Sequence, residues 1–132
     1  MVNMKETDKW LMLATEEFNY AVGDLSDSSL SSFSQTCYHF QQAAEKYLKA
    51  FILANNLSFR KIHNLVELAK LCASTSPDFK NIIDEAALLN PYYTDTRYPV
   101  HWPMIFMRED ADKAKNAAEK IKKLVEEKIK TS

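Results

Sequence analysis

The sequence is poor in the residues on which turns and sheets depend. It holds one glycine and four prolines among 132 residues. A β-rich protein needs many turn positions with positive φ, which glycine adopts most readily. The composition therefore favours an all-α fold. The length is that of one domain, and we expect residues 1–132 to form a single helical domain.

A charge excess, a cysteine framework and long apolar segments are also missing. With 17 basic and 18 acidic residues the net charge is −1, so no global field attracts nucleic acid. The two cysteines, Cys37 and Cys72, lie among apolar residues in helical patterns, and we expect free, buried thiols in a reducing compartment. No apolar stretch reaches about 18 residues, and residues 1–10 lack the apolar core of a signal peptide. These absences predict a cytoplasmic protein without membrane contact.

The motifs that the sequence lacks exclude several kinds of chemistry. Its three histidines are far apart, and its cysteines do not form a CxxC pair, so no metal site is expected. One glycine cannot supply the glycine-rich loops that bind phosphates in P-loop and dinucleotide-binding proteins. We therefore expect no cofactor.

Residues 29–55 have the most regular pattern in the chain and predict a long central helix. Apolar residues recur there at steps of three and four: Phe33, Cys37, Phe40, Ala44, Tyr47 and Phe51. The serines at its start are candidate caps, and Asn55 with Asn56 is expected to end it. The roughly opposite side is polar: Tyr38, Gln42, Glu45 and Lys49. Whether this polar side also carries chemistry stays open at this point.

Four further helices are predicted at about residues 7–23, 64–73, 77–89 and 104 or 107 to 130. Thr7 or Asp8 can cap the first, and Gly23, the single glycine, is expected at its end. Asn64 can cap the second, and Ser76 followed by Pro77 is a strong start signal for the third. The last has a lysine-rich exterior. We interpret that exterior as a solvated face, with a phosphate-contacting surface as the alternative.

The segment NPYYTDTRYPVHWP, residues 90–103, differs from the rest of the chain. It holds three of the prolines and four aromatic residues, so it cannot form one regular helix. We expect an ordered loop held against the helices by its aromatic side chains: Tyr92, Tyr93, Tyr98 and Trp102. The predicted fold is thus an up-down bundle of four to five helices with this aromatic and proline-rich loop before the last helix.

Arg97 and His101 in this loop are the candidate catalytic residues. An arginine can hold a phosphate through two parallel hydrogen bonds, and a histidine can take a proton near neutral pH. Together they would support cleavage of RNA without a metal. The histidine would accept the proton of the 2′-hydroxyl, and the arginine would offset the charge growing on phosphorus. The alternative is that Arg97 pairs with an acidic side chain such as Glu45 and holds the loop, with His101 on the surface.

Several blocks of the sequence resemble HEPN domains. The blocks are CYHFQQAAEKYLKA at residues 37–50, HNL at 63–65 and TRYP at 96–99, with Trp10 and Ala14 in the first helix and Tyr93 before the last block. The resemblance covers about residues 5–130. It implies an up-down helical bundle that forms a homodimer. It also implies a partner, a minimal nucleotidyltransferase encoded beside it in a toxin–antitoxin-like pair.

The resemblance implies two kinds of function. Many HEPN proteins resemble metal-independent endoribonucleases whose arginine and histidine are separated by four to six residues, whereas three separate Arg97 from His101. Other HEPN-like domains bind nucleotides or partner proteins. We therefore expect a dimeric nucleotide- or partner-binding module. Its binding residues are expected to be Tyr38, Gln42, Glu45, Lys49 and Tyr98. The alternative is an endoribonuclease that uses Arg97 and His101 on RNA.

Overall fold

A computed structural model describes residues 4–58, 61–93 and 105–131 of the chain. These ranges contain α1 (Met4–Leu25), α2 (Ser34–Ala54), α3 (Leu65–Thr75), the 3-10 helix η1 (Pro77–Ile82), α4 (Ile83–Leu89) and α6 (Arg108–Thr131). No strand occurs within them, so the all-α prediction is confirmed. None of the helices in these ranges is both long and apolar enough to cross a membrane. The predictions on Arg97, Tyr98, His101 and Trp102 lie outside the described residues.

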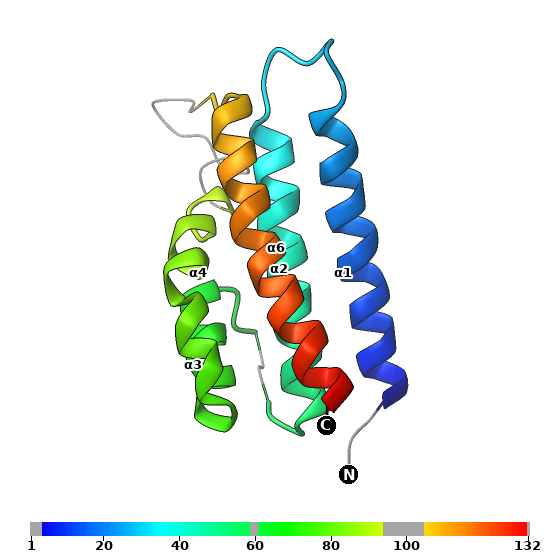
Figure 1. The fold of residues 1–132 in the computed structure, drawn as a ribbon, viewed down its shortest axis with the longest axis vertical. Coiled ribbons are helices and arrows are strands. Elements are labelled where there is room, and N and C mark those ends of the chain that lie inside the picture. The colour runs from blue at the N-terminus through cyan, green and yellow to red at the C-terminus, as the bar shows by residue number, and fades with distance from the viewer. Residues whose placement is uncertain (1–3, 59–60, 94–104, 132) are drawn as a thin grey trace.

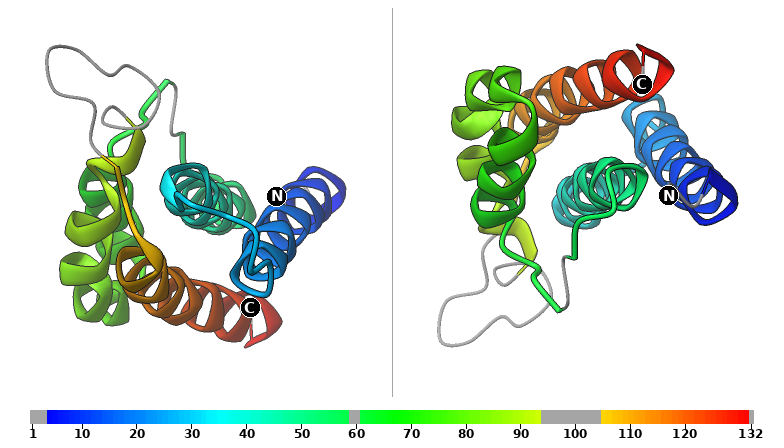
Figure 2. Two further views of the ribbon diagram at one scale, coloured as in Figure 1. Left: turned by 90° about the horizontal axis from the view of Figure 1, so that it is seen from above. Right: turned by 90° about the horizontal axis from the view of Figure 1, so that it is seen from below.

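The helices form a bundle around α2. Helices α1, α2 and α6 run along the long axis of the molecule, and α3, η1 and α4 lie along one edge (Figure 1). Seen from either end, α2 lies in the middle (Figure 2). Helix α1, helix α6 and the α3–α4 pair surround it on three sides. None of the described helices covers its fourth side, and this open side carries the candidate site described below.

The core is built on the predicted apolar stripe of α2. All six residues of that stripe are buried: Phe33, Cys37, Phe40, Ala44, Tyr47 and Phe51. Phe40 meets Phe18 of α1 edge to face with ring centroids 5.5 Å apart, and Phe51 lies 4.4 Å from Phe79 of η1. Burial of each large apolar side chain stabilises the fold by roughly 1.5–3 kcal/mol. The periodicity of the sequence therefore identified the core face correctly.

The core also contains the hydroxyl of Tyr47 and the thiols of Cys37 and Cys72. The hydroxyls of Tyr47 and Thr15 share a hydrogen bond of 2.8 Å, and burial raises the pKa of Tyr47 to about 12. Cys37 and Cys72 are free and buried, as predicted. Burial also raises the pKa of each of these thiols to about 12, so both stay protonated and act as small apolar groups.

The start of α2 differs from the prediction. The helix begins at Ser34 rather than Ser29, and its N-cap is Phe33, which has no side-chain cap bond. The backbone N–H of Phe33 donates to the carbonyl of Phe106 at 2.7 Å, and the Phe106 N–H donates to Ser34 Oγ at 3.0 Å. These two bonds to Phe106, which is distant in the sequence, tie the start of α2 to the segment before α6. Among the serines expected to cap the helix, Ser32 accepts a long bond of 3.3 Å from the Ser34 N–H.

The ends of α1 also differ from the prediction, and the residue with positive φ is not Gly23. Helix α1 begins at Met4, so Thr7 is a buried residue within it and not its cap. Gly23 lies in the last turn of α1 and has no positive φ. The described residue with positive φ is Asn56, at 56°, directly after α2. Asparagine tolerates this conformation better than most residues, which is why Asn55 and Asn56 end α2 as predicted.

The helices after α2 follow the prediction with one change. Asn64 caps α3, since its Oδ1 accepts the Glu67 N–H at 3.1 Å. Residues 77–89 form η1 and then α4 rather than one α-helix. In η1 the two buried anchors, Phe79 and Ile82, are three residues apart, which matches the period of a 3-10 helix. Ser76 provides the backbone N-cap before Pro77 but makes no side-chain cap bond.

Candidate functional site

The polar side of α2 is only partly exposed. Tyr38 and Gln42 are half-buried, but Glu45 is 6% exposed and Lys49 is 4% exposed. The polar side of α2 therefore includes two charged residues that are buried, Glu45 and Lys49. Side chains from other segments, among them His63 and Trp10, contact these two residues. Gln42 Nε2 donates to Gln41 Oε1 at 2.7 Å.

Glu45 is the centre of a buried charged cluster. Lys49 Nζ donates to Glu45 Oε2 at 2.8 Å, and His63 Nδ1 lies 3.1 Å from the same oxygen. Lys49 Nζ also lies 5.7 Å from the centre of the Trp10 ring. Within the described structure the second oxygen, Oε1, is buried and has no hydrogen-bond partner. An unsatisfied buried carboxylate oxygen costs stability, so Oε1 is a candidate acceptor for a donor that the described residues do not supply. We call Glu45, Lys49 and His63 the Glu45 cluster.

Aromatic rings line the outer edge of the Glu45 cluster. The Tyr93 ring is nearly parallel to the His63 imidazole, with an interplanar angle of 6° and centroids 6.0 Å apart. Tyr93 also lies 6.4 Å, between ring centroids, from Tyr38 of α2. His63 is about half exposed and both tyrosines are partly exposed. The rings therefore present apolar, flat surface beside a buried charge.

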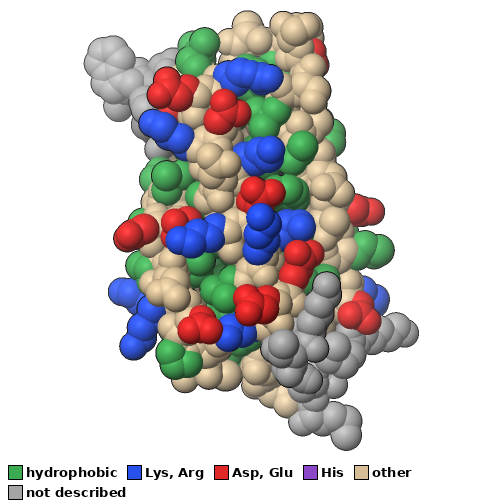
Figure 3. All heavy atoms as spheres, viewed as in Figure 1, with side chains coloured by type: hydrophobic (Ala, Val, Ile, Leu, Met, Phe, Trp, Pro, Cys, Tyr) green, Lys and Arg blue, Asp and Glu red, His purple; other side chains and the backbone are tan. Residues whose placement is uncertain are grey.

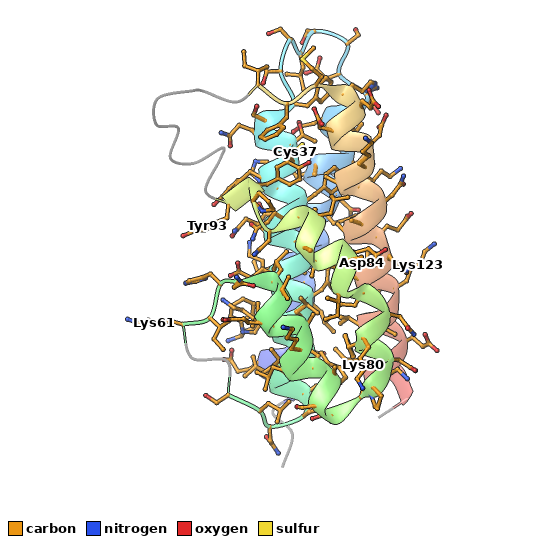
Figure 4. The ribbon with its side chains drawn as sticks, turned by 90° about the vertical axis from the view of Figure 1, so that its left-hand side faces the viewer. Cys37, Lys61, Lys80, Asp84, Tyr93 and Lys123 are labelled. Atoms are coloured by element: carbon orange, nitrogen blue, oxygen red, sulfur yellow. The ribbon has the colours of Figure 1, made fainter. Side chains whose placement is uncertain are left out.

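A small hollow opens where α3 begins. It has a volume of about 210 Å³ and is lined by His63, Asn64, Asn90 and Tyr93. The side-chain oxygens of Asn64 and Asn90 accept the backbone N–H groups of Glu67 and Leu65 in the first turn of α3. Each amide can therefore offer its N–H₂ group, a donor, to a ligand. Figure 4 shows Tyr93 and Lys61 projecting from the same side of the molecule, and Lys61 is exposed.

A second cluster lies between α1 and α2, and the sequence analysis missed it. His39 Nδ1 lies 2.6 Å from Glu17 Oε2, and Lys46 Nζ donates to Glu17 Oε1. The ring of Tyr20 meets His39 edge to face at 4.9 Å. Partial burial raises the pKa of Glu17, but the hydrogen bonds from His39 and Lys46 outweigh it and leave that pKa below its usual value. Both oxygens of this carboxylate are satisfied. We call Glu17, His39 and Lys46 the Glu17 cluster.

The lysine-rich face of α6 fits the solvated interpretation. Figure 3 shows Lys and Arg side chains interleaved with Asp and Glu over this face of the molecule. Lys120 Nζ donates to Glu85 at 3.2 Å, and Lys128 Nζ donates to Asp78 at 2.6 Å. Such exposed pairs contribute little each, but they leave no uniformly basic surface here for a polyanion. In the described residues no group of three or more His, Cys, Asp or Glu side chains could hold a metal ion.

Of the seven residues predicted for the site, the described structure brings Glu45 and Lys49 into one cluster and places Tyr38 beside it through Tyr93. Arg97, Tyr98 and His101 lie outside the described residues. His63 is the functional candidate that the residue analysis passed over. Its signal was the HNL block at residues 63–65, which carried part of the family resemblance.

Comparisons with known proteins agree with this fold. The family model described as HEPN domain matches residues 7–128. The crystal structure of TT1696 from Thermus thermophilus is 30% identical, with a TM-score of 0.76 over 92% of this chain and 97% of that chain. The crystal structure of ST0689, an archaeal HEPN homologue, is 24% identical, with a TM-score of 0.73 over 93% of this chain and 97% of that one. No curated protein gives a significant match.

Proposed function

We propose, from the premise that this chain belongs to the HEPN family, that it is a dimeric nucleotide- or partner-binding module. The observation that carries the proposal is the Glu45 cluster. It contains a buried carboxylate with one unpartnered oxygen among the described residues, beside the half-exposed ring of His63 and the partly exposed ring of Tyr93. A binding site of this kind combines flat apolar surface with a few fixed polar groups. We place the nucleotide on the open side of α2.

The chemistry of this surface suits a nucleotide. The faces of Tyr38 and Tyr93 can stack a nucleobase, and such stacking contributes about 1–3 kcal/mol per base. The hollow beside them offers amide donors from Asn64 and Asn90, which suit hydroxyl or phosphate oxygens. A net charge of −1 argues against binding driven by long-range attraction. Short-range contacts of these rings and amides would have to supply the affinity.

The proposed partners are a second copy of the chain and a minimal nucleotidyltransferase, in a toxin–antitoxin-like pair. Support for both is the family resemblance. Light scattering coupled to size-exclusion chromatography tests the dimer, and co-purification with a nucleotidyltransferase encoded beside the gene tests the pairing. A monomer at all concentrations that binds no such protein would contradict both.

Isothermal titration calorimetry with nucleoside monophosphates tests nucleotide binding directly. The wild-type protein is expected to bind, and Tyr93→Ala is expected to weaken binding. Tyr20→Ala is the matched control, because Tyr20 is a tyrosine on the surface that contacts the Glu17 cluster instead. Absence of binding by the wild type, or equal losses in both variants, would contradict the proposed site.

The second candidate function is metal-independent cleavage of RNA by Arg97 and His101. The segment that carries both residues follows Tyr93 directly in the chain, and Tyr93 contacts the Glu45 cluster. Cleavage in EDTA that is lost in Arg97→Ala and in His101→Ala would support it. Cleavage unchanged in Arg97→Ala, or no cleavage by the wild type, would rule it out.

A further inference from the structure

The imidazole of His63 is held in one orientation by two neighbours. Its Nδ1 lies 3.1 Å from the buried Glu45 Oε2, and its ring lies parallel to that of Tyr93. Glu45 itself is held by Lys49, one helical turn further along α2. Yet the His63 side chain is 53% exposed. A half-exposed ring with one nitrogen held inside can offer its other nitrogen, Nε2, to a ligand.

The contact with Glu45 decides what Nε2 offers. Glu45 Oε2 already accepts from Lys49 Nζ, and a carboxylate oxygen accepts hydrogen bonds, so the hydrogen of a neutral His63 ring is on the Nδ1 that faces it. Nε2 then carries a lone pair and is an acceptor. A phosphate oxygen is also an acceptor, so neutral His63 does not pair with phosphate. The group that fits Nε2 is an O–H or N–H donor.

A ribose hydroxyl is the donor that best fits this place. The ring faces of Tyr38 and Tyr93 suit the base, whereas the hollow lined by His63, Asn64 and Asn90 is small and polar, as the sugar and phosphate require. The 2′-hydroxyl is the donor that separates ribonucleotides from deoxyribonucleotides. We propose that His63, positioned by Glu45 and Lys49, accepts a hydrogen bond from the ribose 2′-hydroxyl, so that the site selects ribonucleotides.

This inference rests on the proposed nucleotide-binding function, and it adds the ligand class and the residue that selects it. Glu45 is a positioning residue in this arrangement, since it acts through His63. The inference also distinguishes the Glu45 cluster from the Glu17 cluster. There His39 has a similar carboxylate contact, but its side chain is 25% exposed and lies against Tyr20.

The test is calorimetric titration with the 5′-monophosphates of the four ribonucleosides and with their 2′-deoxy counterparts. The wild type is expected to bind the ribonucleotide of each pair roughly three- to tenfold more tightly, the contribution of one hydrogen bond. His63→Phe keeps a ring beside Tyr93 but removes both nitrogens, and it is expected to bind both members of each pair equally. Tyr93→Ala is expected to weaken the binding of the ribonucleotide and of its 2′-deoxy counterpart by the same factor, so that the preference for ribose remains.

Glu45→Gln provides a second test that does not depend on affinity alone. Glutamine has nearly the same volume as glutamate, but its N–H₂ group is a donor. If that group faces His63, Nδ1 must accept, and the hydrogen of the neutral ring is then on Nε2. We expect the ribose preference to fall, and ¹⁵N NMR of the imidazole to show the Nδ1–H form in the wild type and a change in the variant.

The failures of the two proposals are distinguishable. Nucleotide binding with no ribose preference, or with a preference that survives in His63→Phe, would overturn the role of His63 and leave the binding function standing. No binding of any nucleotide would overturn both. Circular dichroism of each variant shows whether a loss reflects unfolding.

Discussion

Two clusters that involve α2 contain the same residue types but differ in how completely their carboxylates are hydrogen-bonded. Each joins a glutamate, a histidine and a lysine, with the histidine Nδ1 on the carboxylate. In the Glu17 cluster each carboxylate oxygen has its own partner. In the Glu45 cluster one oxygen serves both partners, and the other is buried without one among the described residues. The two clusters therefore share their residue types and differ in how completely the carboxylate is hydrogen-bonded.

The largest expected effect is on stability when the Glu45 cluster loses its carboxylate. Glu45→Ala leaves the Lys49 ammonium buried without its ion-pair partner, and breaking a buried pair in this way costs about 3–5 kcal/mol. Urea unfolding followed by circular dichroism measures the change. Glu17→Ala is the matched control and is expected to cost less, because Lys46 is about one quarter exposed. An equal or larger loss in Glu17→Ala would contradict the ranking.

The next effect is on nucleotide affinity and would separate the clusters by function. Tyr93→Ala removes the ring parallel to His63, and loss of one stacked base is expected to weaken binding by about 1–3 kcal/mol. Tyr20→Ala removes the ring beside His39 and should leave the affinity unchanged. Calorimetric titration of both variants with one nucleoside monophosphate gives the comparison. If Tyr20→Ala lost as much affinity, the Glu17 cluster would belong to the site.

A smaller effect concerns the pH dependence of the Glu17 cluster. Since the hydrogen bonds from His39 and Lys46 lower the pKa of Glu17 below its ordinary value of 4.5, its ionised form stabilises the fold. That contribution is complete above the unfolded pKa and is lost as the pH falls through the lower, folded pKa. We expect Glu17→Gln to cost about 1 kcal/mol at pH ~6 and progressively less below pH ~4. Urea unfolding of both proteins across this range measures the difference, and a constant difference would contradict the assignment.

The smallest expected effect is on the stability of His63→Phe. The side chain is half exposed, and the new ring can keep its place beside Tyr93, so the free energy of unfolding should change by less than about 0.5 kcal/mol. Thermal unfolding of this variant and of His39→Phe gives the comparison. A larger loss in His63→Phe than in His39→Phe would show that His63 is mainly structural.

The features that could be predicted from the sequence are those set by residues close together in the chain. The spacing of Phe33, Phe40 and Tyr47 identified the core face of α2, and Asn64 was recognised as the cap of α3 because both signals lie within a few residues. The start of α2 could not be predicted, since it depends on bonds between residues 33 and 34 and the distant Phe106.

The candidate site was predictable only where its contacts join residues that are close in the sequence. Glu45 and Lys49 are one helical turn apart, so their pairing follows from the sequence. Their burial does not, because Trp10 and His63 come from other segments. The Glu17 cluster gave no local signal, since Glu17 pairs with residues 22 and 29 positions away.

The most direct test follows the imidazole resonances of His63 and His39 in one NMR titration with a nucleoside monophosphate. The His63 ring reports on the proposed site, and the His39 ring is the internal control. The variants His63→Phe and His39→Phe identify which signal belongs to which ring. The account predicts that the His63 nitrogens shift in proportion to the fraction bound, and by more than those of His39, whose ring lies 5.6 Å from that of Tyr38. Shifts at His39 alone, or at neither ring despite binding, would contradict the claim that the Glu45 cluster is the nucleotide site.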